Sequence, residues 1–135
     1  MIVVDASVFA VAIGDDGEPG EIARASIRGH EVSAPDLIDV ETVSVLRARW
    51  RAGTLSARRF AAAIEDLSTF PGDRYPSLPF MWRAYELRGN VSAYDATYVA
   101  LAEQLGCELV TADTRLIAAP GVRCSFRLVQ VSRMR

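Results

Sequence analysis

The sequence opens on Ile2-Val3-Val4-Asp5, three β-branched residues followed directly by an acid. A short apolar run of this kind is typical of a strand buried on both faces of a parallel sheet. A helix is expected to follow from Ser7. In parallel α/β sheets, ligands bind outside the carboxyl ends of the strands. This stretch therefore predicts the fold class and places Asp5 at the edge where chemistry is expected.

Further along the chain, strand patterns alternate with helix patterns. Strands are expected at 2–4, 32–35, 108–111 and 126–131, with a short one around 74–75 inside a loop over 70–79. Helices are expected from Ser7 up to a turn at 14–20, and then over 21–28, 37–50, 56–67, 80–88, 92–105 and 114–118. The helices over 37–50 and 56–67 are expected to form a hairpin. This alternation predicts one domain over 1–135, a three-layer α/β/α sandwich around a mostly parallel central sheet.

The composition excludes several classes of protein. The chain has 135 residues, half of them hydrophobic, with 15 basic and 17 acidic side chains. Every basic residue is Arg, so a Schiff base, a P-loop lysine and a lysine general base are excluded. Two cysteines and one histidine far from them make structural zinc improbable. The chain has no signal peptide pattern and no apolar run of ~18 residues, so we expect a cytoplasmic protein without a membrane span.

Four acids are expected to share one place in this fold. Asp5 and Asp113 follow strands, Asp95 lies in the first turn of a helix, and Glu41 lies on a helix face with Leu37, Val40 and Val45. Carboxylates gathered together repel one another unless a divalent cation compensates them. Oxygen ligands without His or Cys favour Mg²⁺, with Mn²⁺ as a possible substitute.

Each acid also has a structural explanation. Asp5 and Asp113 are suited to cap the helices that follow them, and Asp95 stands three residues after Ser92, the spacing of a capping box. Asp36 is expected to cap the long helix, and with Asp39 to be solvent-facing or capping. Glu41 is the hardest acid to explain in this way, because helix faces rarely bury an unpaired acid.

Four segments together resemble the PIN-domain ribonucleases, and most closely the VapC-type toxins of toxin–antitoxin pairs. The segments are Val4-Asp5-Ala6-Ser7-Val8, Asp36-Leu37-Ile38-Asp39-Val40-Glu41, Tyr94-Asp95-Ala96 and Val110-Thr111-Ala112-Asp113. The resemblance covers nearly the whole chain in order. It implies a Mg²⁺-dependent endoribonuclease that dimerises, cuts structured RNA such as tRNA or rRNA, and is held inactive by a small cognate antitoxin.

The resemblance also implies roles for particular residues. The family's acidic quartet corresponds to Asp5, Glu41, Asp95 and Asp113, with Asp5 and Asp95 the surest metal ligands. Two hydroxyl positions, Ser7 and Thr111, would bond a carboxylate or a metal-bound water. Ala112 is a departure, since relatives often carry a polar residue there. Setting the quartet aside leaves 13 acids against 15 arginines, so the overall acidity does not oppose binding to RNA.

Other functions remain open at this stage. A receiver-type domain would need a lysine, and a haloacid-dehalogenase-type phosphatase would need an Asp where Ser7 stands. A noncatalytic α/β binding module and a PIN-like RNA-processing or DNA-directed nuclease outside toxin–antitoxin systems are the alternatives.

Two further groups of residues could form binding surfaces. A helix bearing Phe80, Met81, Trp82 and Tyr85 is expected to face the core or a dimer partner rather than bases. Candidate phosphate contacts are Arg47, Arg49, Arg51, Arg58, Arg59, Arg123, Arg127, Arg133 and Arg135.

Overall fold

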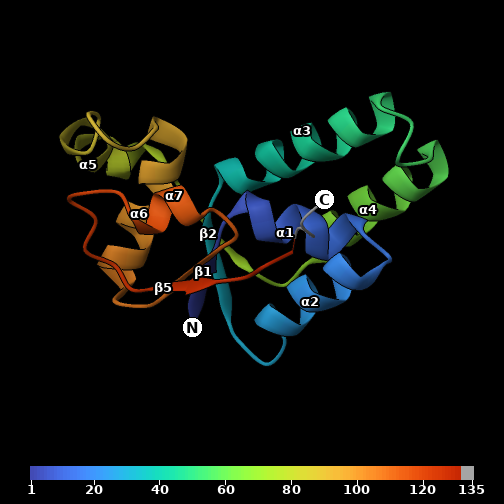
Figure 1. Ribbon diagram of the computed structural model, residues 1–135, viewed down its shortest axis with the longest axis horizontal. Helices are drawn as coiled ribbons and strands as arrows, with labels where there is room; N and C mark the ends of the chain where they lie inside the picture. Colours follow the sequence, from blue (N-terminus) through green and yellow to red (C-terminus); the bar gives the residue numbers. More distant parts are fainter. Residues whose placement is uncertain (132–135) are drawn as a thin grey trace.

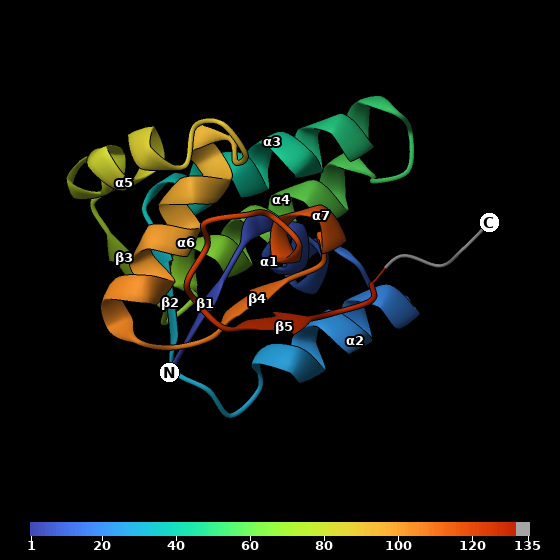
Figure 2. The same ribbon diagram turned by 60° about the vertical axis from the view of Figure 1, so that its left-hand side comes forward.

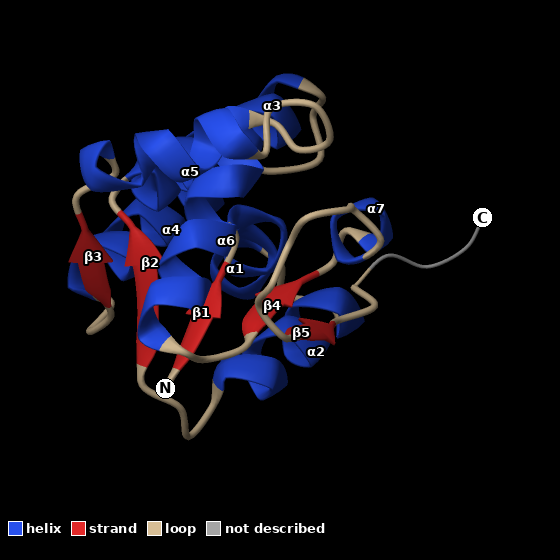
Figure 3. Ribbon diagram, turned by 90° about the vertical axis from the view of Figure 1, so that its left-hand side faces the viewer, coloured by secondary structure: helices blue, strands red, loops and turns tan. Residues whose placement is uncertain are grey.

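The computed structural model describes residues 1–131 and contains a five-stranded sheet whose neighbouring strands are all parallel. The strands are β1 (Ile2–Val4), β2 (Val32–Pro35), β3 (Asp73–Tyr75), β4 (Leu109–Thr111) and β5 (Phe126–Leu128). Their order is β3-β2-β1-β4-β5, so successive connections run in opposite directions on the two sides of β1. Figure 3 shows these strands with helices packed around them.

Helices cover both faces of this sheet. They are α1 (Ala6–Gly14), α2 (Glu18–Ile27), α3 (Leu37–Arg51), α4 (Ala57–Thr69), a 3₁₀ turn η1 (Leu78–Phe80), α5 (Met81–Glu86), α6 (Ala93–Leu105) and α7 (Thr114–Ile117). In Figure 1, α5 and α6 lie on one side of the sheet, and α1, α2 and α4 lie on the other. Figure 2 shows α5 and α6 side by side. The expected three-layer α/β/α architecture is confirmed.

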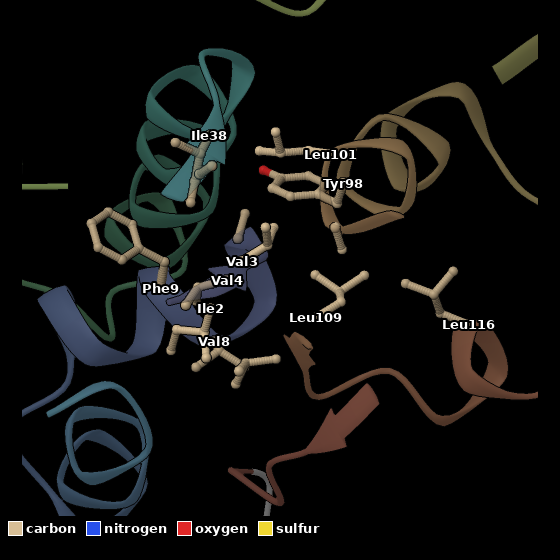
Figure 4. Close-up of a cluster of buried hydrophobic side chains, with 14 of the residues drawn as sticks. Ile2, Val3, Val4, Val8, Phe9, Ile38, Tyr98, Leu101, Leu109 and Leu116 are labelled. Carbon is tan, nitrogen blue, oxygen red and sulfur yellow. The ribbon is translucent and has the colours of Figure 1, made fainter. Parts of the chain in front are cut away.

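The core explains why β1 lies at the centre. All three residues of β1 are buried, as expected of a strand that is covered on both faces. Figure 4 shows Val3 and Val4 between side chains of α3 and α6 and of the helix that follows β1, with Ile38, Phe9 and Leu101 around them. Because β1 is flanked by β2 and β4, the strand order reverses at β1, and α/β sheets bind ligands at such a switch point.

Several element boundaries differ from the sequence-based prediction. The helix expected at 21–28 begins at Glu18, inside the segment predicted as a turn. The first turn of a helix tolerates Pro19, because backbone N–H groups there have no hydrogen-bond partner within the helix and proline lacks only that group. The last strand ends at Leu128 instead of Val131, and the helix expected at 80–88 is a 3₁₀ turn followed by a short α-helix.

The start of α3 differs in its side-chain contacts. Asp36 has helical backbone angles and makes no side-chain cap, so the expected capping role was wrong. Its carboxylate instead accepts a hydrogen bond from the Ser77 hydroxyl at 2.6 Å. Asp39 is neither a cap nor simply solvated, since it forms an ion pair with Arg74 at 2.9 Å. These contacts join the start of α3 to the segment around β3.

The face of α3 that is buried is also not the expected one. Ile38, Thr42 and Leu46 are its buried residues, whereas Val40 and Val45 are exposed. The helix packs on the sheet and on α1 along one narrow stripe, and α3 and α4 form the expected hairpin that projects from the sheet in Figure 1. Among the described residues, no helix combines the length and apolar character that a bilayer crossing requires.

Candidate active site

The four acids singled out in the sequence line one cleft at the carboxyl edge of the sheet. Asp5 follows β1, Asp113 follows β4, Glu41 comes from α3 and Asp95 from the first turn of α6. The cleft measures about 310 Å³, and its other lining residues are Ala6, Ser7, Ser44, Val45 and Tyr98. Chain segments more than 100 residues apart in sequence meet here because β1 and β4 are neighbours in the sheet.

Asp5 is the most buried and most firmly held of the acids, with 4% of its surface exposed. One carboxylate oxygen, Oδ1, accepts hydrogen bonds from the Ser7 hydroxyl at 2.5 Å and from the Ser7 and Val8 amides. The other, Oδ2, accepts from the Thr111 hydroxyl at 2.5 Å. Both hydroxyl residues named from the sequence therefore orient Asp5, which also caps α1.

The electrostatics of the cleft favour protonation in the absence of a cation. Burial raises the pKa of Asp5 from 3.8 to about 6, although hydrogen bonds from Ser7 and Thr111 oppose the rise. Burial also raises the pKa of Glu41 and of Asp95. The charge of Asp95 adds to the rise at Asp5 and Glu41, and the charge of Asp113 adds to the rise at Asp95. Repulsion thus links the other three carboxylates to Asp95, which lies between them electrostatically.

Asp95 and Asp113 combine a cleft position with a place at a helix start. The Ser92 hydroxyl accepts a hydrogen bond from the Asp95 amide at 3.1 Å, which is half of the expected capping box. Asp113 caps α7 by accepting from the Arg115 amide at 2.9 Å. Capping and a place in the cleft are therefore compatible, and the capping explanation of these residues does not remove them from the site.

Glu41 has no capping role, and its partner was not identified from the sequence. Its Oε1 accepts a hydrogen bond from the Tyr98 hydroxyl at 2.6 Å. Burial, followed by the Glu41 carboxylate, raises the pKa of Tyr98, so this hydroxyl stays a neutral donor. The spacing of Tyr98 from Asp95, three residues along one helix, is the signal that could have placed both on one side of α6.

The guanidinium of Arg115 lies beside Asp113 at the rim of the cleft. The Arg115 side chain is 93% exposed, and its Nε lies 3.6 Å from Asp113 Oδ1. Its charge lowers the pKa of Asp95, against the larger effect of burial. Arg115 was not among the arginines singled out in the sequence, although its place two residues after Asp113 could have indicated it.

The donor set fits a Mg²⁺ ion that keeps part of its water shell. The cleft is lined by carboxylate and hydroxyl oxygens, and none of its lining residues is basic. Among residues 1–131, no three Asp, Glu, His or Cys side chains stand close enough to enclose a metal ion by themselves. Mg²⁺ binds in this manner, through one or two carboxylates with water and substrate phosphate completing its octahedron.

The arginines expected from the sequence to contact phosphates divide into two groups. Arg59 pairs with Asp16 at 2.9 Å, Arg49 bonds the Gly14 carbonyl, and Arg127 pairs with Glu108 at 2.6 Å. The guanidinium groups of these three arginines are therefore engaged in contacts within the chain. Arg47, Arg51, Arg58 and Arg123 are exposed, and Arg133 and Arg135 lie outside the described residues.

The aromatic helix and the cysteines lie away from the acids. Phe80 is buried, as expected for a core residue, whereas Trp82 is 77% exposed. Cys107 and Cys124 are free thiols that line a second cavity of about 650 Å³ at the amino ends of the strands. That cavity is larger than the acidic cleft but lies at the opposite edge of the sheet from the acids.

Comparison with known proteins agrees with this geometry. The family model of the PIN domain matches residues 2–122. VapC ribonuclease Mb0985 of Mycobacterium bovis is 40% identical over 129 residues, covering 96% of this chain and 98% of that protein. Ribonuclease VapC1 of Mycobacterium tuberculosis is 36% identical over 129 residues, covering 95% of this chain and 97% of that protein.

A solved structure gives the same result for the fold. The crystal structure of Mycobacterium tuberculosis VapC20, described as a sarcin-ricin loop cleaving toxin, superimposes with a TM-score of 0.69 at 20% identity. The superposition covers 91% of this chain and 97% of the VapC20 chain. The chain belongs to the PIN-domain family and, within it, to the VapC proteins.

Proposed function

We propose that this chain is a Mg²⁺-dependent endoribonuclease, the toxin of a toxin–antitoxin pair, that cleaves structured RNA such as tRNA or rRNA. The observation that carries the proposal is the convergence of four carboxylates on one cleft at the switch point of the sheet. Relatives that are 36% to 40% identical over nearly the whole chain are named VapC ribonucleases. Because the proposed substrate is cellular RNA, the proposed compartment is the cytoplasm.

In this proposal Asp5, Glu41, Asp95 and Asp113 surround the ion, one or two of them binding it directly and the others through its water shell, with Mn²⁺ as a possible substitute. When bound there, Mg²⁺ would polarise the scissile phosphate and lower the pKa of a bound water molecule. Asp5 presents a carboxylate whose orientation Ser7 and Thr111 already determine, so little reorganisation is needed when a cation binds. Arg115, at the rim, is suited to hold a neighbouring phosphate of the RNA.

The rival is a noncatalytic binding module in which the acids only cap helices. The caps made by Asp5 and Asp113 are the observation that favours it. Glu41 opposes it, because this acid lines the cleft and caps nothing.

Cleavage assays with defined RNA separate the two. The wild-type protein with Mg²⁺ should produce fragments with 5′-phosphate and 3′-hydroxyl ends, and EDTA should abolish cleavage. Asp95→Asn should lose activity, whereas Asp73→Asn, an exposed acid of β3, should keep it. Products with 2′,3′-cyclic phosphates that form in EDTA would contradict metal-dependent hydrolysis. Cleavage confined to RNA processing sites or to DNA would favour a PIN-like nuclease outside toxin–antitoxin systems.

Two exposed apolar surfaces support the proposed protein partners. Leu78, Trp82 and Val40 are 74% to 80% exposed, and the Ser77–Asp36 hydrogen bond brings their segments together. We assign this surface to a second copy of the chain. Light scattering tests the assignment, because a dimer should have twice the 14.7 kDa mass of the single chain.

A separate groove of about 350 Å³ on the hairpin of α3 and α4 is proposed as the binding site of the antitoxin. Its lining residues are Trp50, Ala57, Phe60, Ala61 and Ile64.

A further inference from the structure

One hydrogen bond connects the cleft to the hydrophobic core. Tyr98 is 1% exposed and lies in the middle of α6, yet its hydroxyl reaches the Glu41 carboxylate on α3 at 2.6 Å. Figure 4 shows the Tyr98 ring packed beside Leu101, with its oxygen directed toward α3. Among the described residues, no other hydrogen bond joins α3 to α6.

In the part of the chain that the structure describes, the Tyr98 hydroxyl is the one hydrogen-bond donor to the Glu41 carboxylate. The side chain is only partly buried and carries the same charge as Asp95, which lies on α6 one turn before Tyr98. Like charges at short range repel, and a flexible Glu side chain can escape into solvent by changing rotamer. A donor anchored in the core opposes that escape and adds no charge to the cleft.

Tyr98 is suited to this task by its own packing. A fully buried aromatic ring has its χ angles determined by its neighbours, so the hydroxyl is held at one point. By contrast, Tyr94 is 64% exposed on the same helix and its hydroxyl makes no hydrogen bond in the described part of the chain. The two tyrosines lie on the same helix and have the same type of side chain, but only Tyr98 is buried and bonded to Glu41.

We propose that Tyr98 is a positioning residue that holds Glu41 in the orientation in which it binds the divalent cation. The inference rests on the proposed metal-dependent function and extends it to a residue outside the acidic quartet. Partners of this kind orient metal ligands, and removing one typically weakens metal affinity by about 10- to 100-fold.

The test measures Mn²⁺ binding to the whole chain by calorimetry, with no RNA present. Tyr98→Phe removes one oxygen atom and keeps the ring, and it should weaken Mn²⁺ binding by at least about tenfold. Tyr94→Phe is the matched control and should bind within twofold of wild type. At saturating Mn²⁺ the cleavage rate of Tyr98→Phe should return to within about threefold of wild type, since in this proposal Tyr98 acts on the cation only through Glu41. Circular dichroism melting without metal shows that each variant is folded.

A double-mutant cycle shows whether the effect passes through Glu41. In a Glu41→Ala background, adding Tyr98→Phe should change Mn²⁺ affinity by less than twofold. Equal affinities for the two Tyr→Phe variants, or additive losses in the cycle, would overturn the inference while leaving the proposed function standing. A wild-type protein that binds no Mn²⁺ would overturn both.

Discussion

At the scale of single residues, Asp5 shows how one side chain serves folding and chemistry together. Its Oδ1 accepts three hydrogen bonds from the first turn of α1, two of them from backbone amides, whereas Oδ2 accepts only from Thr111. A carboxylate offers about four lone-pair positions, so Oδ2 keeps one for a cation. The cap orients the group and leaves part of it available to the cleft.

Asp5→Asn should therefore separate the two roles. Asn caps helices about as well as Asp, and it removes a charge whose burial raises the pKa of Asp5 to about 6. We expect the metal-free variant at pH 7.5 to melt at a temperature at least as high as wild type. It should cleave no RNA and should gain no stability from Mn²⁺. Loss of several degrees with full cleavage activity would instead make capping the only role of Asp5.

At the scale of elements, the junction of α1 and α2 depends on a glycine inside a helix. A Cβ added at Gly20 would lie 1.8 Å from the Asp15 carbonyl oxygen and 2.9 Å from Arg24 Nη1. Arg24 uses that nitrogen to donate to the carbonyls of Asp15 and Ala12, at 2.7 and 3.0 Å. The missing side chain lets α2 approach the end of α1 and lets the guanidinium close the junction.

Gly20→Ala should consequently destabilise the protein, although alanine favours helices. The clash involves backbone, so α2 must shift, and we expect a loss of about 1–3 kcal/mol in the free energy of unfolding. Gly89→Ala is the control, because a Cβ there meets nothing within 4 Å. Urea unfolding of both variants measures the difference. Equal midpoints for the two variants would show that the junction tolerates a side chain.

The long helix α3 buries a hydroxyl group that makes no hydrogen bond in the described part of the chain. The Thr42 hydroxyl is fully buried and is the one buried side-chain polar atom without a hydrogen-bond partner among the described residues. An unsatisfied buried polar group costs about 1–3 kcal/mol, and valine has the same branched shape. Thr42→Val should raise the free energy of unfolding by about 1 kcal/mol. Thr42→Ser keeps the hydroxyl, loses a methyl group and should be less stable than wild type in the same urea titration.

At the scale of the whole molecule, the cleft makes the stability of the metal-free protein depend on pH. Burial raises the folded-state pKa of Asp5 from its ordinary value of 3.8 to about 6, and it also raises the pKa values of Glu41 and Asp95. Between pH 3.8 and about pH 6, the folded protein therefore binds more protons at Asp5 than the unfolded chain does. Stability from this group is fully present below the unfolded pKa and is lost as the pH rises through the folded one.

Metal-free protein should thus melt at a lower temperature at pH 7.5 than at pH 5.5. For Asp5 alone, the full rise in pKa corresponds to on the order of 3 kcal/mol, of which only about 1 kcal/mol is lost between pH 5.5 and 7.5. Mg²⁺ at pH 7.5 should raise the melting temperature, and at pH 5.5 the increase should be smaller because protons compete for the same carboxylates. Calorimetric scans at both pH values, with EDTA or with Mg²⁺, measure all four cases. A melting temperature in EDTA that rises from pH 5.5 to 7.5 would contradict the electrostatic account.

Much of the architecture could be predicted because it depends on neighbouring residues. β-Branched runs indicated strands at 2–4 and 32–35, and Gly106 with φ of +65° ends α6 where a glycine was expected to stop it. The same local logic failed at Glu18, where the surrounding Gly and Asp residues resembled a turn but Pro19 opened a helix. It failed again for Val40, because the exposed face of α3 depends on which helices pack against it.

The sequence by itself determined the elements, the α/β class and the identity of the acids, since each follows from patterns within one or a few turns of chain. Only the tertiary structure decided the strand order, and with it the hydrogen bond from Thr111 to Asp5 across 106 residues. The contact between Tyr98 and Glu41, 57 residues apart, arises in the same way. Such contacts depend on how crossover helices pack on the two faces of the sheet, a choice made by burial of the whole core rather than by any local run of residues.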